Sequence, residues 1–550
     1  MRNLKNIIVL LTVAAGIHSC SLDYTPLTKP SEQTFWNNSQ SAELALTACY
    51  RGNLLNNVEQ ATEFLVNDWW SYHGLIMMEH LSDNAFDRRG VNNAFFKLSN
   101  GTLTSDNSFL NNYWDAAYKR IGMCNRFLQG AAGLPDTESK KKQMIAEARF
   151  LRAAMYFYLA SYFKDVPLVT VPLTGEESNN VKKTSQKDIL EWCATELGEA
   201  ANDLPRFSEI GDSDKGRACK QAALAFQGRV YMLLKEWGKG ATAYNEIINV
   251  LGDNDIHSKY QELFYASTGM ANKENIYYIH YIAGYFGFGM PIQALSAKDG
   301  GWSLINPTAD LFEAYEFTDG TKFSYDDPRY EYPNLGKNRD PRLDYTIYYN
   351  GADFMGTKYV MTPDGDATKK EKLDYATEAS KTGFMMRKYF DGNPISDPKD
   401  ADGLTPVIRY AEVLLSYLEC LIESGATIDQ PTLNATINKV RGRADVNMPP
   451  ITETNKDKLR EIVRHERRVE LTFEGIRYWD LMRWGIAHEK LNDEIWGAPY
   501  PDCADYANLT DKIDPTGKSR WHVARRDFRN PTDYTWPIPQ SEQNINPNLR

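Results

Sequence analysis

The fold is most strongly indicated by residues 462–485, which run Ile462-Val463-Arg464-His465-Glu466-Arg467-Arg468-Val469-Glu470-Leu471, then Glu474-Gly475, then Arg477-Tyr478-Trp479-Asp480-Leu481-Met482-Arg483-Trp484-Gly485. Several charged residues of this stretch recur at mixed spacings of three and four on one expected helix: Glu466, Arg467, Arg468, Glu470 and Glu474. Side chains at these spacings are neighbours on a helix surface, so the acidic and basic members can pair among themselves. Arg477 and Asp480 extend the set. We interpret the stretch as an ion-pair network that stabilises the fold rather than as a binding site.

Further segments have the apolar spacing of amphipathic helices. In residues 140–163, apolar side chains recur at steps of three and four: Ile145, Ala148, Leu151, Met155, Leu159 and Tyr162. Residues 217–237 and 411–421 have the same spacing. Earlier helical segments at 106–129 and 186–203 precede the first two, and a Leu-Pro pair ends each of them. Because alanines stand where helices must approach closely, the pattern predicts tetratricopeptide-like helix hairpins, with a generic helical bundle as the alternative.

The character of the chain changes between residues 255 and 405. Gly, Pro, Asp and Tyr cluster at 282–291, 298–302 and 363–366, while residues 277–281 have the composition of a short strand. Long loops inside a compact protein are usually functional. Helices resume from 406 to about 490, and the last 60 residues are rich in loops. We therefore expect a helical scaffold that carries a loop-rich functional region.

The N-terminus has the pattern of a targeting segment. Arg2 and Lys5 precede the apolar run 7–15, which is too short to span a membrane as a helix. Ser19-Cys20 follows, and a small residue before Cys resembles a bacterial lipobox. We predict a signal peptide over 1–19, lipidation of Cys20, and a polar tether over 20–34. The alternative is an ordinary secretory signal with an incidental cysteine.

Charge and cysteine content exclude several classes of protein. The chain has 62 Lys and Arg against 73 Asp and Glu, a net charge of -11, so it has no overall attraction to nucleic acid. The six cysteines after Cys20 form no CxxC pair and have no His at zinc spacing, so we expect buried free thiols and no metal, with one or two disulfides as the alternative. Tyr (32) and Trp (12) together outnumber Phe (23), and these two types suit wet interfaces.

Several enzyme signatures are incomplete. Thr516-Gly517-Lys518-Ser519 resembles the end of a phosphate-binding loop, but Lys512 replaces the first glycine. The stretch 465–469 has Val469 where a zinc protease needs its second His, and Pro398 replaces the first ligand of a calcium-loop pattern at 398–403. We therefore predict no enzyme and no cofactor. A glycosidase stays open as an alternative, because it needs only two facing carboxylates.

Four stretches together carry a resemblance to a known family. The first is Cys20 with Phe35-Trp36-Asn37-Asn38, and the second is Glu147-Ala148-Arg149-Phe150-Leu151-Arg152-Ala153 with Asp165-Val166-Pro167-Leu168. The third is Arg441-Gly442-Arg443-Ala444 with residues 462–485, and the last is Pro537-Ile538-Pro539 with Glu542 and Asn546-Pro547. In this order, along nearly the whole chain, they resemble the SusD/RagB family of nutrient-binding outer-membrane lipoproteins.

The resemblance implies a mostly α-helical fold. It consists of about four tetratricopeptide-like helix pairs that form a scaffold, with a mixed, loop-rich ligand-binding region packed on it. The corresponding division of the chain is an N-terminal helical region at 35–254, a loop-rich ligand-binding region at 255–405, and a C-terminal region at 406–550.

The resemblance also implies a function. Such a protein is anchored by lipid to the outer membrane, faces outside, and captures an oligosaccharide or polysaccharide without chemistry. It delivers the glycan to a TonB-dependent SusC-like transporter, over which it acts as a lid. A peptide-binding uptake lipoprotein, a glycosidase and a scaffold that binds only protein are the alternatives.

Sugars present apolar C–H faces and a ring of hydroxyls, so aromatic and polar side chains on loops suit them. By resemblance, Trp302 stacks on sugar and Tyr285 forms a second wall, with Phe286 and Phe288 nearby. We add Asp83, Asn84 and Arg88 as polar contacts, and Trp69, Trp70 and Tyr72 as another aromatic cluster. The alternatives are that Trp69 and Trp70 belong to the core, that the polar trio is a solvated loop, and that Phe286 and Phe288 brace the loop.

Overall fold

The computed structural model describes residues 35–52, 68–131, 133–134, 136–359, 361 and 380–550. The predicted signal peptide, Cys20, the tether and the loop at 363–366 lie outside the described residues. The described part is mostly helical, which confirms the predicted fold class.

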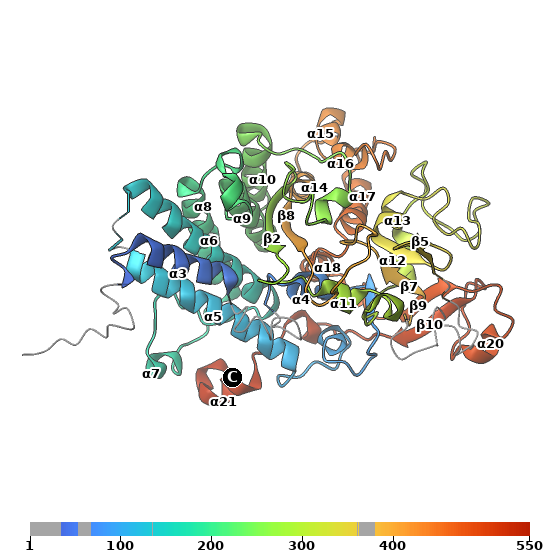
Figure 1. Cartoon of the computed structure of the whole chain (residues 1–550), viewed down its shortest axis with the longest axis horizontal. Helices are drawn as coiled ribbons and strands as arrows, with labels where there is room; N and C mark the ends of the chain where they lie inside the picture. The colour runs from blue at the N-terminus through green and yellow to red at the C-terminus, as the bar shows by residue number, and fades with distance from the viewer. Residues whose placement is uncertain (1–34, 53–67, 132, 135, 360, 362–379) are drawn as a thin grey trace, which may run out of the picture.

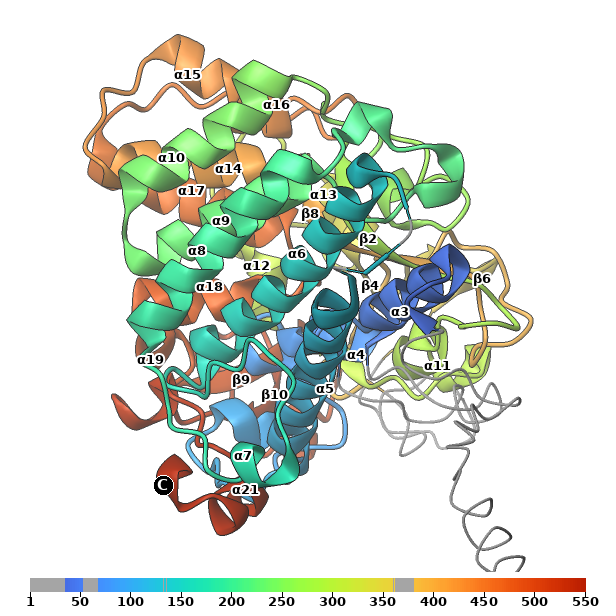
Figure 2. The ribbon, with the colours of Figure 1, turned by 90° about the vertical axis from the view of Figure 1, so that its left-hand side faces the viewer.

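A row of long helices forms one side of the molecule (Figure 1). It comprises α5 (Ser108–Ala131), α6 (Glu138–Tyr162), α8 (Gln186–Asp203) and α9 (Lys220–Leu234). Each helix packs on the next, and α3 (Ser39–Arg51) packs on α5, as the side view in Figure 2 shows. Thr137 and Ser185 cap the starts of α6 and α8, since each side chain accepts a backbone N–H of the first turn. The four predicted helical segments are therefore confirmed.

Helices from the C-terminal part of the chain continue this row. α10 (Trp237–Asn245) packs on α9 and on α14 (Tyr410–Glu423), and α14 packs on α17 (Lys456–Glu470). Glycines allow the close approach: a Cβ at Gly228 of α9 would stand 2.4 Å from the Tyr244 ring, and one at Gly240 of α10 would stand 2.9 Å from Cys420 Sγ. The loop-rich region between α10 and α14 is thus an insertion in a continuous helical scaffold.

The strands are short and pair two by two. β2 (Asn275–Tyr281) runs antiparallel to β8 (Gly403–Arg409), which confirms the predicted strand. The other pairs are β1 (Ala85–Asp87) with β3 (Ile305–Pro307), β4 (Ile347–Tyr349) with β7 (Phe384–Met386), β5 (Asp353–Phe354) with β6 (Thr357–Lys358), and β9 (Glu494–Pro499) with β10 (Arg520–Arg525). The shorter helices are α4 (Tyr72–Leu75), α7 (Gly175–Ser178), α11 (Met290–Ala294), α12 (Ala309–Ala314), α13 (Arg342–Thr346), α15 (Gln430–Ala435), α16 (Ile437–Arg441), α18 (Arg477–Trp484), α19 (Ala487–Lys490), α20 (Tyr506–Leu509) and α21 (Gln540–Ile545).

An aromatic stack joins the two ends of the described chain in the core. Trp536 is fully buried, its ring lies 4.7 Å from Tyr162, and its backbone N–H donates to the Tyr162 carbonyl. Trp69 also stacks on Tyr162, with 5.4 Å between the ring centroids, and on Trp536, with 6.1 Å. Such buried ring pairs add to the free energy gained from area burial. The C-terminal stretch is therefore part of the same core as α6.

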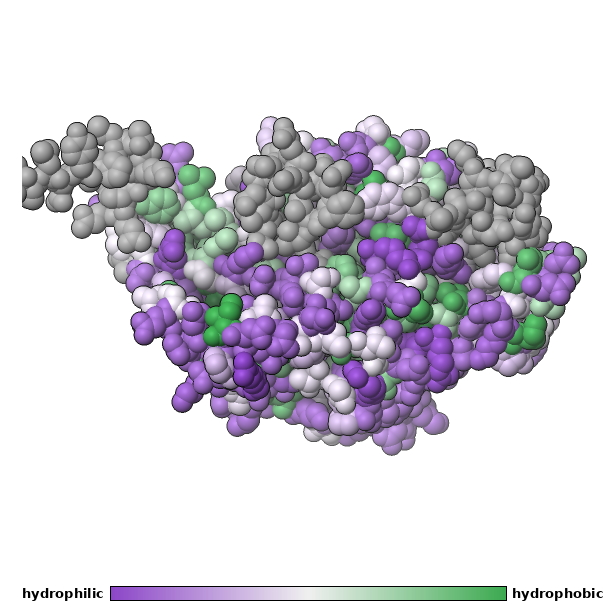
Figure 3. Space-filling view, turned by 90° about the horizontal axis from the view of Figure 1, so that it is seen from below, coloured by the Kyte–Doolittle hydropathy of each residue, from purple (hydrophilic) through white to green (hydrophobic). Residues whose placement is uncertain are grey.

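Three further features concern the surface, the cysteines and the membrane-spanning potential of the helices. Seen from below, the described surface is mainly hydrophilic, with small separate hydrophobic patches (Figure 3). Cys49, Cys124, Cys193, Cys219 and Cys420 are buried free thiols, as predicted, and Cys503 is half-buried. Within the described residues, no helix has both the length and the apolarity that a membrane crossing requires.

The charged stretch at 462–485 forms a buried network, but its partners differ from those predicted. Glu470 accepts hydrogen bonds from three guanidiniums, those of Arg342 (2.9 Å), Arg409 (3.0 Å) and Arg443 (2.7 Å). Burial alone would raise the pKa of Glu470, yet these three arginines hold it below its usual value.

Glu466 and Glu474 extend this network to further elements. Glu466 pairs with Arg342 and Arg441, and Glu474 pairs with Arg409 and Lys388. The glutamates therefore bind arginines and a lysine from α13, β8, α16 and neighbouring loops instead of pairing within their own helix. The predicted ion-pair network is present. Within the predicted set, Arg467 and Asp480 do pair, at 2.9 Å, whereas the prediction that the glutamates pair with members of the set is wrong. A buried charge must be paired, but its partner can come from any part of the chain. The spacing of residues in the sequence reveals only partners on the same helix.

We expect Glu470→Ala to lower the free energy of unfolding by about 3–5 kcal/mol, because it leaves buried guanidiniums without their shared carboxylate. Chemical denaturation measures the change. Glu191→Ala is the matched control: Glu191 pairs with Lys187 on exposed α8, with side-chain exposures of 47% and 73%, and its loss should cost less than about 0.5 kcal/mol. Equal effects of the two variants would contradict the role assigned to Glu470.

Candidate functional site

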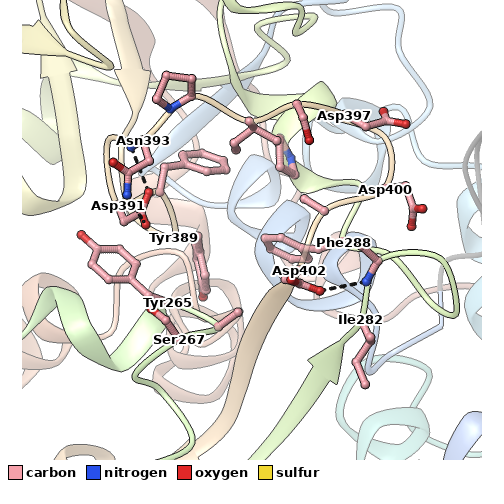
Figure 4. Close-up of a pocket in the computed structure, with 18 of the residues that line it drawn as sticks. Tyr265, Ser267, Ile282, Phe288, Tyr389, Asp391, Asn393, Asp397, Asp400 and Asp402 are labelled. Carbon is pink, nitrogen blue, oxygen red and sulfur yellow. Dashed lines mark hydrogen bonds between the residues drawn. The ribbon is translucent and has the colours of Figure 1, made fainter.

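A cavity of about 620 Å³ lies where the loops at one end of the β2–β8 ribbon meet (Figure 4). The antiparallel pairing sets Tyr281 at the end of β2 opposite Gly403 at the start of β8. The segment after β2 and the segment before β8 therefore emerge side by side. Aromatic residues form one part of the lining: Tyr265, Phe288, Tyr389 and Phe390.

The segment after β2 forms a tight turn at residues 282–286, here called the aromatic turn. Ile282 and Phe286 exchange two backbone hydrogen bonds of 2.8 and 2.9 Å, and Gly284 takes the positive φ of 79° that the turn requires. The turn leaves Tyr285 77% exposed and Ile282 46% exposed. Ile282 and Ala283 of this turn line the cavity, whereas Tyr285 stands on the same turn outside the described lining, with its ring open to a ligand.

The segment before β8, residues 391–402, is here called the aspartate loop, and in Figure 4 it arches over Tyr265, Tyr389 and Phe288. It is bonded directly to the aromatic turn: Asp402 accepts the Ala283 N–H at 2.9 Å, and Asp400 accepts the Gly284 N–H at 2.8 Å. A Cβ at position 287 would stand 1.9 Å from Asp400 Oδ1, so this close approach requires Gly287. The two loops form one hydrogen-bonded unit.

Trp302 belongs to the neighbouring segment. Its backbone N–H donates to the Ile292 carbonyl of α11 at 2.7 Å, and the Ile292 N–H donates to Pro398 of the aspartate loop at 2.9 Å. The Trp302 side chain is half-buried. The structure thus brings Trp302, α11 and the aspartate loop into one assembly next to the aromatic turn.

Phe286 and Phe288 pack on tyrosines of the core. Phe288 is 2% exposed and packs between Tyr72 and Tyr281, at 5.7 and 5.0 Å between centroids, and Phe286 stacks on Tyr281 at 5.0 Å. Phe288 also lines the cavity floor. Both rings therefore brace the loop, as the alternative interpretation held.

The early aromatic cluster lies inside the core, which corrects the prediction for it. Trp69 and Trp70 are each 1% exposed, and Tyr72 is 6% exposed. Trp69 stacks on Tyr158 at 5.0 Å, while Tyr72 supports Phe288 from below. No face of Trp69 or Trp70 is open to a sugar, so the two residues act through packing.

Asp83 and Asn84 are also buried, which corrects their assignment as ligand contacts. Asp83 binds the Arg477 guanidinium through two hydrogen bonds of 2.7 and 2.8 Å, and Asn84 accepts one from Arg468 at 2.8 Å. Burial alone would raise the pKa of Asp83, but Arg468 and Arg477 hold it below its usual range. Both residues belong to the ion network.

Arg88 stands at the edge of the β1–β3 pair, where its backbone N–H donates to Leu304 at 3.1 Å. It is half-buried and is not among the described residues that line the cavity.

Glu79 anchors this buried polar region. Its carboxylate accepts hydrogen bonds from Asn84 at 2.8 Å and from Ser82 at 3.3 Å. Burial raises the pKa of Glu79 to about 7, because the hydrogen bonds do not offset the loss of water around the charged form. Near neutral pH the group therefore stands at its titration point inside the protein.

The sequence interpretation missed the aspartate loop and the ring of Tyr265. The aspartates of 398–403 were considered only as an incomplete calcium loop, whereas Asp400 and Asp402 hold the aromatic turn. In the part of the chain that the structure describes, no group of three or more His, Cys, Asp or Glu side chains is arranged for a metal ion. A run of loop-forming residues with several aspartates was the signal that could have found the segment.

Comparisons with known proteins bear on the whole chain. Residues 266–550 match the family model described as SusD family, and residues 52–232 match one described as starch-binding associating with outer membrane. A crystal structure of a SusD-like carbohydrate-binding protein from Bacteroides fragilis is 68% identical, with a TM-score of 0.91, over 94% of this chain and all of that chain.

More distant relatives match over two thirds or more of the chain. A SusD-like protein of Formosa agariphila is 24% identical over 89% of this chain and 91% of its own length. The starch-binding protein SusD of Bacteroides thetaiotaomicron is 24% identical over 67% of this chain and 69% of its own length.

We expect the stability of wild type, relative to a Glu79→Gln variant, to depend on pH. A carboxyl whose pKa is raised from 4.5 to about 7 on folding loses stability as the pH rises through this window, and glutamine does not titrate. From pH 5 to pH 8, wild type should lose about 2–3 kcal/mol relative to the variant. Denaturant unfolding at both values measures this, and a difference that is constant with pH would contradict it.

Proposed function

Because the chain belongs to the SusD family, we propose that it is a cell-surface glycan-binding lipoprotein whose ligand lies in the cavity between the aromatic turn and the aspartate loop. The observation that carries the proposal is the 77% exposed Tyr285 on a turn whose residues Ile282 and Ala283 line a 620 Å³ cavity. An exposed ring at the mouth of a concave, partly aromatic surface offers a stacking face to a ligand.

The chemistry of the cavity suits a sugar. A pyranose has an apolar C–H face that stacks on an aromatic ring and hydroxyls that hydrogen-bond to carboxylates and amides. Tyr285 supplies the exposed ring, and Asn393 and the aspartates supply polar groups on the aspartate loop. Trp302, half-buried on the adjoining segment, is the second candidate ring.

The similar proteins support a binding role. The Bacteroides fragilis protein, at 68% identity, carries the description carbohydrate binding, and the Bacteroides thetaiotaomicron relative is named a starch-binding protein. Neither description mentions a reaction. We propose that this chain likewise binds a glycan and performs no chemistry, so that its ligand leaves unchanged.

We further propose that the protein is tied to the outer membrane through lipid on Cys20 and faces outside. The family description of outer-membrane association supports this location. In this position it would deliver its glycan to a TonB-dependent SusC-like transporter and cover it as a lid. The rigid row from α5 to α17 is suited to holding the loops in a fixed orientation above such a partner.

We expect Tyr285→Ala to weaken binding of the glycan about tenfold, which corresponds to about 1.4 kcal/mol, because it removes a stacking face. Trp302→Ala should weaken binding as well, without a change in melting temperature. Affinity gels across polysaccharides identify the glycan, and titration calorimetry then measures its affinity.

Tyr285→Phe is the matched control for this experiment, because it keeps the ring and should keep the affinity within about twofold. Full affinity in Tyr285→Ala would remove the aromatic turn from the site. Retention of oligopeptides but of no glycan would support the peptide-binding alternative, and new reducing ends would support a glycosidase.

We expect Cys20→Ser to release the protein from the membrane fraction, because the acyl chains that anchor it are attached to this residue. Fractionation of cells followed by immunodetection measures the effect. Cys503→Ser is the control, since Cys503 is a half-buried cysteine of the body and its loss should leave the protein in the membrane fraction. Membrane retention of Cys20→Ser would contradict the proposed anchor.

A further inference from the structure

The cavity beside the aromatic turn has a one-sided charge. Its lining contains four aspartates, Asp391, Asp397, Asp400 and Asp402, and no Lys or Arg among the described lining residues. Among the described lining residues, His280 is the side chain that could carry a positive charge. Burial lowers the pKa of His280, which keeps its imidazole neutral at pH 7. The lining is therefore anionic at neutral pH.

Unlike Glu466, Glu470 and Glu474, these aspartates form no ion pair with an arginine of the described residues. Within the described residues, the Asp397 side chain accepts the Lys399 backbone N–H at 2.9 Å, and those of Asp400 and Asp402 accept backbone N–H groups of the aromatic turn. The second oxygen of each of these three makes no hydrogen bond to the residues that the structure describes. Glu470, in contrast, has three arginines around it.

One lysine, Lys399, lies on the aspartate loop itself but is not among the described lining residues. The loop from 391 to 402 thus carries four carboxylates and one lysine. A concave surface with charges of one sign concentrates the field in front of it.

We propose that this cavity selects its ligand by charge, accepting neutral or amino sugars and rejecting glycans that carry carboxylate or sulfate groups. The inference rests on the proposed glycan-binding function and adds the class of glycan to it. The aspartate carboxylates would repel the negative charge of an anionic sugar unit in the cavity. The hydroxyls of a neutral sugar can instead donate hydrogen bonds to the aspartate oxygens. The aromatic walls serve either kind of sugar equally, so the discrimination comes from the aspartates.

The charge of the cavity can be tested without any glycan. We would place a single reactive thiol in the lining by Ser267→Cys, an exposed position, in the full chain with Cys20→Ser and Cys503→Ser. The rates of labelling by cationic trimethylammonioethyl methanethiosulfonate and by anionic sulfonatoethyl methanethiosulfonate are then compared. We expect the cation-to-anion rate ratio to fall at least about fivefold when Asp391→Asn and Asp397→Asn are added, and to fall less in high salt.

The matched control neutralises two distant, exposed carboxylates, by Asp212→Asn and Asp457→Asn, whose side chains are 95% and 89% exposed. This pair removes the same net charge from the protein but should leave the rate ratio at the introduced thiol unchanged within about twofold. An equal change with both pairs, or no change with either, would overturn the proposal.

Binding to matched glycans tests the selection itself. Soluble starch and laminarin are each compared with a derivative carboxylated at the primary hydroxyls, by affinity gel at low salt. We expect each carboxylated derivative to bind at least about tenfold more weakly than its parent, and the Asp391→Asn/Asp397→Asn variant to narrow this ratio several-fold. Equal binding of parent and derivative to wild type would overturn the charge selection while leaving glycan binding intact.

The proposed glycan binding and the proposed selection by charge can therefore be refuted independently. If neither starch nor laminarin is retained, the proposed function fails for these glycans. The labelling ratio at the introduced thiol still decides whether the cavity is anionic.

Discussion

The carboxylate of Glu470 is the constraint on which the rest of the structure depends. It lies in the core and binds guanidiniums from α13, from the end of β8 and from the segment after α16. A buried charge is tolerated only when it is fully paired, so these elements must reach one point together. Arg409 is the last residue of β8, so its ion pair with Glu470 fixes the position of this strand. The aspartate loop ends where β8 begins, at Gly403, and is therefore positioned by the same ion pair.

The β2–β8 ribbon connects the buried ion pairs of the core with the loops that line the cavity. One of its ends is tied to Glu470 and Glu474 through Arg409, while the other end bears the aromatic turn and the aspartate loop. Carboxylates serve opposite purposes along this path. Inside, each is paired with arginine and holds elements together; at the cavity, aspartates hold backbone N–H groups and keep an oxygen free. Loops of irregular shape can in this way present fixed side chains to a ligand.

Much of the scaffold could be predicted from the sequence, and the site only in part. Helical periodicity is local, so residues 186–203 were expected as a helix and form α8 over the same range. Asp83 was taken for a ligand contact because its partner Arg477 stands 394 positions away, where no spacing rule applies. The aspartate loop escaped notice for a similar reason: Asp402 meets Ala283 across 119 positions, and only the pairing of β2 with β8 brings them together.

The position of Trp536 has a consequence for how the chain reaches its native state. Its ring fills a space between Tyr162 and Phe163 of the first helix hairpin, which has been synthesised long before it. That space stays open in every nascent chain that ends before Trp536, so the N-terminal half has an incomplete hydrophobic interior during synthesis. Closure of contacts so distant in sequence is slow. For the export proposed from the N-terminal signal, a core that closes late favours passage of the chain through a secretion channel before folding.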